Sequence, residues 1–143
     1  MTTVQYVWHF HHKILVEALT EPLEARIADI KWNKPIDEQA LRLRLLHLVK
    51  GQLPTAFVDA SLAYHGAGAT YYGAGATYYG AEVALGKARA NYYRVQVACS
   101  TEINALHSVE CPDCPWNGST IFPEATTNGG VTQTIFTTTG TNA

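Results

Sequence analysis

The chain has 143 residues, with 10 Lys and Arg residues against 12 Asp and Glu residues and a formal net charge of −2. This length allows one domain with a hydrophobic core, and the lack of a basic excess argues against a nucleic-acid-binding protein. Three cysteines are too few for a secreted disulfide framework, and the start of the chain lacks a signal-peptide pattern, so we expect a reducing, cytoplasmic setting.

The first predicted element is a short strand within residues 3–10. Val4, Tyr6, Trp8 and Phe10 occupy every second position, so they fall on one side of an extended segment. The alternative that this pattern leaves open is a hydrophobic staple that leads into the helix that follows.

Two amphipathic helices are predicted next, over residues 12–33 and 36–49. In the first, apolar residues recur at intervals of three and four, namely Leu15, Leu19, Leu23, Ile27 and Ile30. Pro22 interrupts this stripe and predicts a kink or a restart. Gly51 predicts the C-terminal cap of the second helix. Residues 1–54 should therefore form an arm and an antiparallel helical hairpin.

A heptad repeat follows and predicts a long, coiled-coil-like helix over residues 55–110. Bulky residues recur every seven positions from Phe57 to Leu106, and mostly small residues follow each of them by three. A strand explains the repeat poorly, because seven is odd and the tyrosines would change faces at every repeat. The predicted seam comprises Tyr64, Ala67, Tyr71, Ala74, Tyr78, Ala81, Leu85 and Tyr92.

Glycines weaken this predicted helix. Five glycines between residues 66 and 80 each disfavour a helix by about 1 kcal/mol relative to alanine, so the helix needs packing partners. A loop between two shorter helices and a silk-like strand remain alternatives for this segment. Residues 60–81 carry no Asp, Glu, Lys or Arg, but their glycines and threonines and their few Leu, Ile or Val residues argue against a membrane span.

A C-x-x-C motif formed by Cys111 and Cys114 carries the clearest chemical signature. Such a motif can present two thiolates to one metal ion, and His107 lies one helical turn before it. The fourth ligand would come from the N-terminal histidine cluster, which comprises His9, His11 and His12. We assign it to His11, which predicts a Cys2His2 zinc site. An unmetallated turn, a disulfide in an exported chain and a redox motif remain open alternatives.

The last predicted segment, residues 111–143, ends in a threonine-rich tail. Asn128-Gly129 is typical of a type I′ turn and predicts a small β hairpin, and a disordered tail is the equal alternative. Asn117 begins an N-x-S sequon, so it is a candidate glycosylation site if the chain is secreted.

Two segments that flank the repeat carry a family resemblance. The sequences HHKILVEALTEPLEARIADIKWNKPIDEQALRLRLL and ECPDCPWNGSTIFP resemble those of an uncharacterised family of small repeat-bearing proteins from phage and environmental sequences. The glycine-rich GAGATYY units and the threonine-rich tail depart from that family, whose repeats are more charged. The resemblance implies no activity and no catalytic residue, and it favours a viral or virus-derived origin.

Together these patterns predict a mainly α, non-enzymatic structural protein. Residues 1–54 are too short to cover the tyrosine seam, so we expect self-association into a filament or another homo-oligomer. The alternative is a small zinc-binding adaptor for another protein, with the repeat as a helical spacer of variable length. No phosphate loop, G-x-S-x-G or H-E-x-x-H motif indicates an enzyme, and nothing indicates a nucleic-acid or small-molecule partner. We expect a cytoplasmic or virion-associated protein.

Overall fold

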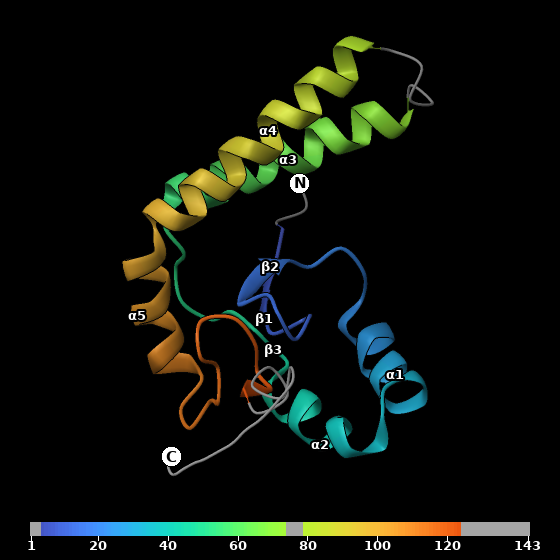
Figure 1. Ribbon diagram of the computed structural model, residues 1–143, viewed down its shortest axis with the longest axis vertical. Helices are drawn as coiled ribbons and strands as arrows, with labels where there is room; N and C mark the ends of the chain where they lie inside the picture. The colour runs from blue at the N-terminus through green and yellow to red at the C-terminus, as the bar shows by residue number, and fades with distance from the viewer. Residues whose placement is uncertain (1–3, 74–78, 124–143) are drawn as a thin grey trace, which may run out of the picture. The chain divides into compact units, whose positions relative to one another are not determined.

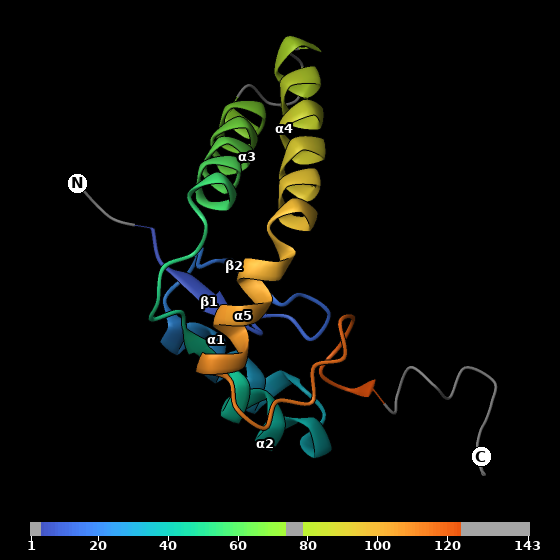
Figure 2. The same ribbon diagram turned by 90° about the vertical axis from the view of Figure 1, so that its left-hand side faces the viewer.

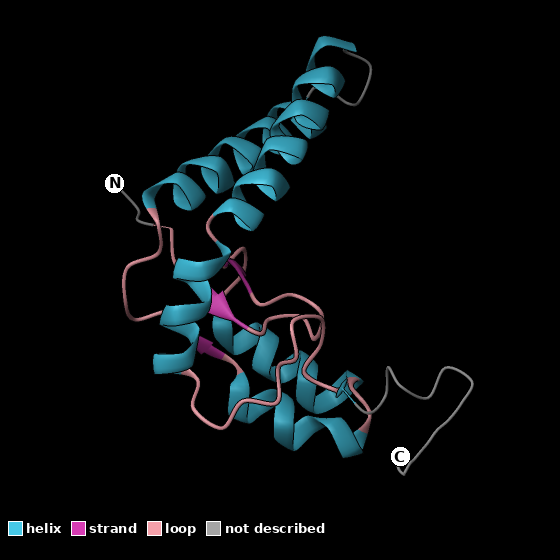
Figure 3. Ribbon diagram, turned by 60° about the vertical axis from the view of Figure 1, so that its left-hand side comes forward, coloured by secondary structure: helices cyan, strands magenta, loops and turns pink. Residues whose placement is uncertain are grey.

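The computed structural model describes residues 4–73 and 79–123, and helices make up most of them (Figure 1). In chain order the elements are β1 (Tyr6–Trp8), β2 (Val16–Ala18), α1 (Leu23–Asn33), α2 (Ile36–Leu45), β3 (His47–Leu48), α3 (Thr55–Gly73), α4 (Tyr79–Ala98) and α5 (Ser100–Glu110). Figure 3 separates the helices from the short strands by colour. The predicted mainly α fold is confirmed.

The chain divides into two compact units. One comprises residues 1–49 and 111–143, and the other comprises residues 50–110. The N-terminal segment and the cysteine motif therefore fold together, although the whole repeat separates them in the sequence. The tail from residue 124 onward, with the predicted hairpin at Asn128-Gly129, lies outside the described residues.

The sheet of the first unit has the order β2-β1-β3, and β1 pairs antiparallel with both neighbours. The strand predicted within residues 3–10 is confirmed as β1. The strand is covered on both faces, since Tyr6, Val7 and Trp8 are all buried. A central strand that is covered on both faces has no polar side, so the alternation that marks a half-exposed strand does not apply.

The first half of the helix predicted over residues 12–33 was wrong. Val16 and Ala18 of β2 are buried on either side of the partly exposed Glu17, and this period of two fits a strand paired with β1. α1 begins directly after Pro22. Proline has a fixed φ that suits the start of a helix and lacks the N–H that a helix interior needs, so Pro22 marks a start rather than a kink.

The helix predicted over residues 36–49 is confirmed as α2, but it ends at Leu45. The predicted last turn joins the sheet as β3, where pairing with β1 replaces helical hydrogen bonds. The prediction that Gly51 caps this helix was therefore wrong. Gly51 instead permits a close contact with Leu106, since a Cβ atom at this glycine would lie 2.5 Å from Cδ1 of that leucine.

In the second unit, α3 and α4 lie side by side and run antiparallel, and α5 follows (Figures 1 and 2). The single continuous helix predicted over residues 55–110 was therefore wrong. The repeat folds back between Gly73 and Tyr79, and Cys99 separates α4 from α5. Glycine-rich helices need packing to be stable. The repeat meets this need by packing its first half, in α3, against its second half, in α4.

Several predicted seam residues pack between α3 and α4. Ala81 and Tyr92 are buried, and the Tyr92 ring centroid lies 5.6 Å from that of Phe57 and 5.3 Å from that of Tyr64. The other described seam residues are partly buried, namely Ala67, Tyr71 and Leu85. Two more, Ala74 and Tyr78, lie outside the described residues. The rings therefore have packing partners within one chain, and self-association stays a prediction.

The repeat glycines within α3 are helical. Gly66, Gly68 and Gly73 all belong to this helix, so neither the loop nor the strand alternative holds for them. Among the described residues, no helix combines the length and the apolar character that crossing a membrane requires.

Candidate metal centre

Four metal-binding side chains come together in the described part of the chain. Their ligand atoms all lie within 4.8 Å of one another, and the residues are His9, His107, Cys111 and Cys114. Three of the four residues are buried, and Cys114 is partly exposed. Within this cluster, Nε2 of His9 lies 3.2 Å from Sγ of Cys114. Such a cluster of soft and borderline ligands, away from bulk water, is a candidate metal centre.

His9 is held in place by the turn that follows β1. Its backbone N–H donates to the carbonyl of Leu15 at 3.0 Å, and its φ of 57° lies in the left-handed region. A non-glycine residue in this region costs about 1–3 kcal/mol, so the surrounding fold must impose the conformation. The ring of Trp116 packs 5.6 Å from the imidazole, and His9 is only 3% exposed.

The two cysteines lie on the loop that follows α5. Asp113 between them has a φ of 58°, and aspartate is one of the residues that adopt this conformation locally. The resulting tight turn places the thiols of Cys111 and Cys114 within 4.8 Å of each other. Cys111 also belongs to a hydrophobic cluster with Leu45 and Ile121, so it is anchored to α2.

Two hydrogen bonds fix the rest of this loop. The Oδ1 atom of Asn117 accepts a hydrogen bond from the N–H of Thr120 at 3.0 Å, which turns the chain. The N–H of Ile121 then donates to the carbonyl of His12 at 2.9 Å, so the loop is tied to the segment that carries His9. Asn117 itself is exposed, and its glycosylation stays a prediction.

His107 occupies the last turn of α5, four residues before Cys111. Residues four apart lie on the same face of an α-helix, so the end of α5 delivers this imidazole to the side of the cysteine loop. His107 was predicted to join Cys111 and Cys114 for this reason, and the structure brings the three together.

His11, the predicted fourth ligand, is not in this cluster. Its Nδ1 atom lies 2.8 Å from Oε2 of Glu17, and its side chain is 52% exposed. His9 takes its place because it directly follows a fully buried strand, whereas His11 lies on the turn beyond. The signal that distinguishes them is the run of apolar residues before His9, which keeps that residue in the core.

Burial has a strong effect on the Cys111 thiol. Burial, together with a hydrogen bond to Cys114, raises the pKa of Cys111 from 9.0 to about 12. Without a metal this thiol therefore stays protonated at neutral pH. A metal cation would displace the proton, because the thiolate is the form that binds metals. All three cysteines, Cys99 included, are free thiols in the structure.

The ligand set fits zinc. Two cysteines and two histidines are a common tetrahedral zinc set, with Zn–S near 2.3 Å and Zn–N near 2.0–2.1 Å. Those bond lengths place the ligand atoms about 3.3–3.8 Å apart. The observed cluster, within 4.8 Å, is slightly wider and needs only small side-chain movements to close on an ion.

Comparisons with protein-family models, with curated proteins and with solved structures found no match to this chain. The resemblance to a phage and environmental family therefore stays a prediction. The function is therefore inferred from the geometry of the candidate metal centre and from the hairpin of α3 and α4.

Proposed function

We propose that this is a non-enzymatic protein in which a structural zinc ion stabilises the unit of residues 1–49 and 111–123. The proposed ligands are His9, His107, Cys111 and Cys114. The observation that carries this proposal is the convergence of four ligand atoms within 4.8 Å in a mostly buried setting. Four protein ligands complete a tetrahedral zinc site and leave no position for a substrate, which favours a structural role over a catalytic one.

Zinc would serve as a cross-link between distant parts of the sequence. His9 follows the central strand, and the cysteines lie on a loop that otherwise contacts the unit through a small hydrophobic cluster. The unit has three short strands and two short helices, so its core is small. Small cores are commonly reinforced by metals or disulfides, and metal binding adds directly to folding free energy.

The test is zinc quantification on purified full-length protein. We expect one zinc per chain in the wild type and loss of zinc in Cys111→Ser and His9→Gln. The matched control is His11→Gln, which changes a neighbouring histidine outside the cluster and should retain zinc. Wild-type protein without bound zinc, or equal zinc loss in both histidine variants, would contradict the proposal.

A second candidate function, self-association, is favoured by a specific observation on the hairpin of α3 and α4. Tyr72, Tyr79 and Tyr93 are 76%, 75% and 53% exposed, although tyrosine is usually at least partly buried. We propose that this hairpin is the interaction element of the protein. Its test is the oligomeric state in solution, and an adaptor for a different protein is the alternative outcome.

A further inference from the structure

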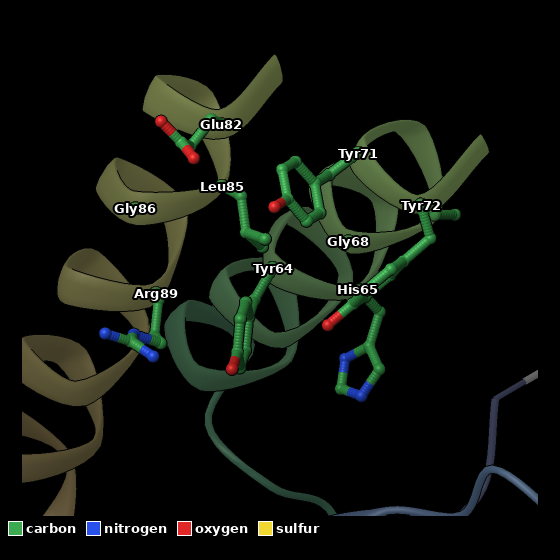
Figure 4. A pocket seen from close by; sticks show the side chains of 10 residues that line it. Tyr64, His65, Gly68, Tyr71, Tyr72, Glu82, Leu85, Gly86 and Arg89 are labelled. Atoms are coloured by element: carbon green, nitrogen blue, oxygen red, sulfur yellow. The ribbon is translucent and has the colours of Figure 1, made fainter. Parts of the chain in front are cut away.

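A groove of about 580 Å³ runs between α3 and α4, and all of its lining residues belong to the unit of residues 50–110 (Figure 4). Tyr64, Tyr71 and Leu85 line it where the two helices meet. His65 and Tyr72 line it from α3, and the charged residues come only from α4, namely Glu82 and Arg89. The groove thus combines three tyrosines and a histidine with one acidic and one basic group.

Two glycines line this groove at positions where packing within the chain does not require glycine. A Cβ atom at Gly86 would meet no other atom within 4 Å, and one at Gly68 would meet only Cδ1 of Leu85, at 3.9 Å. An alanine would therefore fit at either position and would favour the helix by about 1 kcal/mol. Since packing within the chain does not require these glycines, their effect is to let another backbone approach the groove closely.

Exposed tyrosines extend the groove along its wall on α4. Tyr79, Gly86 and Tyr93 are seven residues apart, so they form one stripe of the helix, and Gly86 lines the groove. On α3, His65 and Tyr72 have the same spacing and both line the groove. The walls on the two helices therefore carry the same column of the heptad.

The two charged side chains of the groove have opposite signs and lie on the same helix. Glu82 and Arg89 are exposed, and neither forms an ion pair with another residue in the described part of the chain. They are seven residues apart on one helix, about 10 Å along its axis, which is too far for a direct pair. A two-fold axis between Leu85 and Gly86 would place Glu82 of each copy opposite Arg89 of the other.

We propose that this groove is a homodimer interface, in which α4 of one copy packs antiparallel against α4 of a second copy. The glycines allow close approach, the tyrosines cover the contact, and two Glu82–Arg89 pairs set its register. The inference rests on the proposed function only in treating the hairpin as the interaction element, and it does not require zinc.

The exposed area supports a dimer of this kind. Tyr72, Tyr79 and Tyr93 together offer about 400 Å² per copy, since a tyrosine buries about 150–250 Å². Two copies double this to about 800 Å², and the groove residues add further area. The total buried area therefore reaches about 1,000 Å², which is the size that a specific interface needs.

A charge-swap experiment on the full chain tests this interface. Light scattering after size-exclusion chromatography should give a dimer for the wild type at micromolar concentration. Glu82→Arg and Arg89→Glu should each weaken the dimer about tenfold, because two attractive pairs become repulsive. The double variant Glu82→Arg/Arg89→Glu should restore it. Lys87→Glu is the control, since Lys87 is on the same helix but does not line the groove.

A monomeric wild type, a filament, or single variants that are not rescued by the double variant would overturn the dimer. Circular dichroism on every variant keeps a folding defect apart from an interface defect. Zinc measured on the same samples separates the two proposals. A zinc-free dimer would contradict the zinc centre and support the interface. A zinc-loaded monomer would support the zinc centre and contradict the interface.

Discussion

The hairpin of α3 and α4 repeats one seven-residue pattern, whereas the unit of residues 1–49 and 111–123 repeats nothing. In the hairpin, one column of tyrosines stacks inside and the next column is exposed, as Tyr92 and Tyr93 show. The other unit is held by individual contacts, such as the Arg26 guanidinium against the Phe10 carbonyl. A repetitive surface can pack on a copy of itself, and a non-repetitive core can converge on one ion.

The largest expected difference between the two units follows zinc removal. Chelation should destabilise the unit of residues 1–49 and 111–123, which we call the zinc unit, by about 5 kcal/mol or more. We expect a smaller effect than the roughly 10–16 kcal/mol of zinc-finger peptides, because part of this core forms without metal. Hydrogen exchange should then show lost protection in β1, β2 and the helix α1, with protection retained in α3 and α4. Equal loss of protection in both units would contradict the separate roles.

The hairpin provides a sharper test in two adjacent tyrosines. Tyr92 is 7% exposed and packs on Phe57 and Tyr64, whereas Tyr93 is 53% exposed. Tyr92→Ala should cost about 3 kcal/mol of unfolding free energy, because it leaves a cavity between the helices. Tyr93→Ala should cost less than about 0.5 kcal/mol in the monomer. Urea unfolding of dilute protein measures both, and similar losses would mean that the heptad does not define the interior.

Arg26 tests the zinc unit in the same way. This residue is 7% exposed and donates two hydrogen bonds to the Phe10 carbonyl, at 3.1 and 2.7 Å, and one to Asp29. Arg26→Met should cost about 2 kcal/mol, because it leaves a buried carbonyl without its charged donor. Lys31→Met on the same helix is the control, since Lys31 is exposed. Equal losses of thermal stability in the two variants would show that the contact between Arg26 and the Phe10 carbonyl does not stabilise this unit.

The smallest expected effect is a pH dependence in the zinc unit. Burial, and next the charge of Arg42, lowers the pKa of His12 below 6.5, so the unfolded chain binds a proton at His12 before the folded chain does. The contribution of His12 to the free energy of unfolding is therefore fully present above about pH 6.5 and decreases as the pH falls below this value. Urea midpoints at about pH 7.5 and about pH 5.5 should differ more in the wild type than in His12→Gln. An identical acid loss in the variant would assign the effect to other groups.

The sequence predicted most where the pattern repeats. Phe57, Ala81 and Tyr92 were placed on the packing seam by their spacing alone, and the structure buries them. The spacing could not show that the helix reverses between Gly73 and Tyr79, because a heptad seam accepts a partner helix from the same chain or from another.

In the other unit, local patterns were less informative because long-range pairing decides the structure. Leu15 and Leu19 fitted a helical stripe, but the antiparallel pairing of Val16 with Trp8 places this segment in a sheet. The cysteine motif and His107 are close in sequence, so three of the four proposed ligands were predictable. His9 was not separable from His11 by spacing, since the choice depends on which side chain the strand buries.

X-ray absorption at the zinc edge tests the central claim most directly. The full-length protein, purified with its zinc, should show two sulfur ligands near 2.3 Å and two nitrogen ligands near 2.0–2.1 Å. His9→Gln should lose one nitrogen ligand or the metal, and His11→Gln should leave the spectrum unchanged. A zinc shell of oxygen and nitrogen ligands without sulfur would contradict the proposed centre.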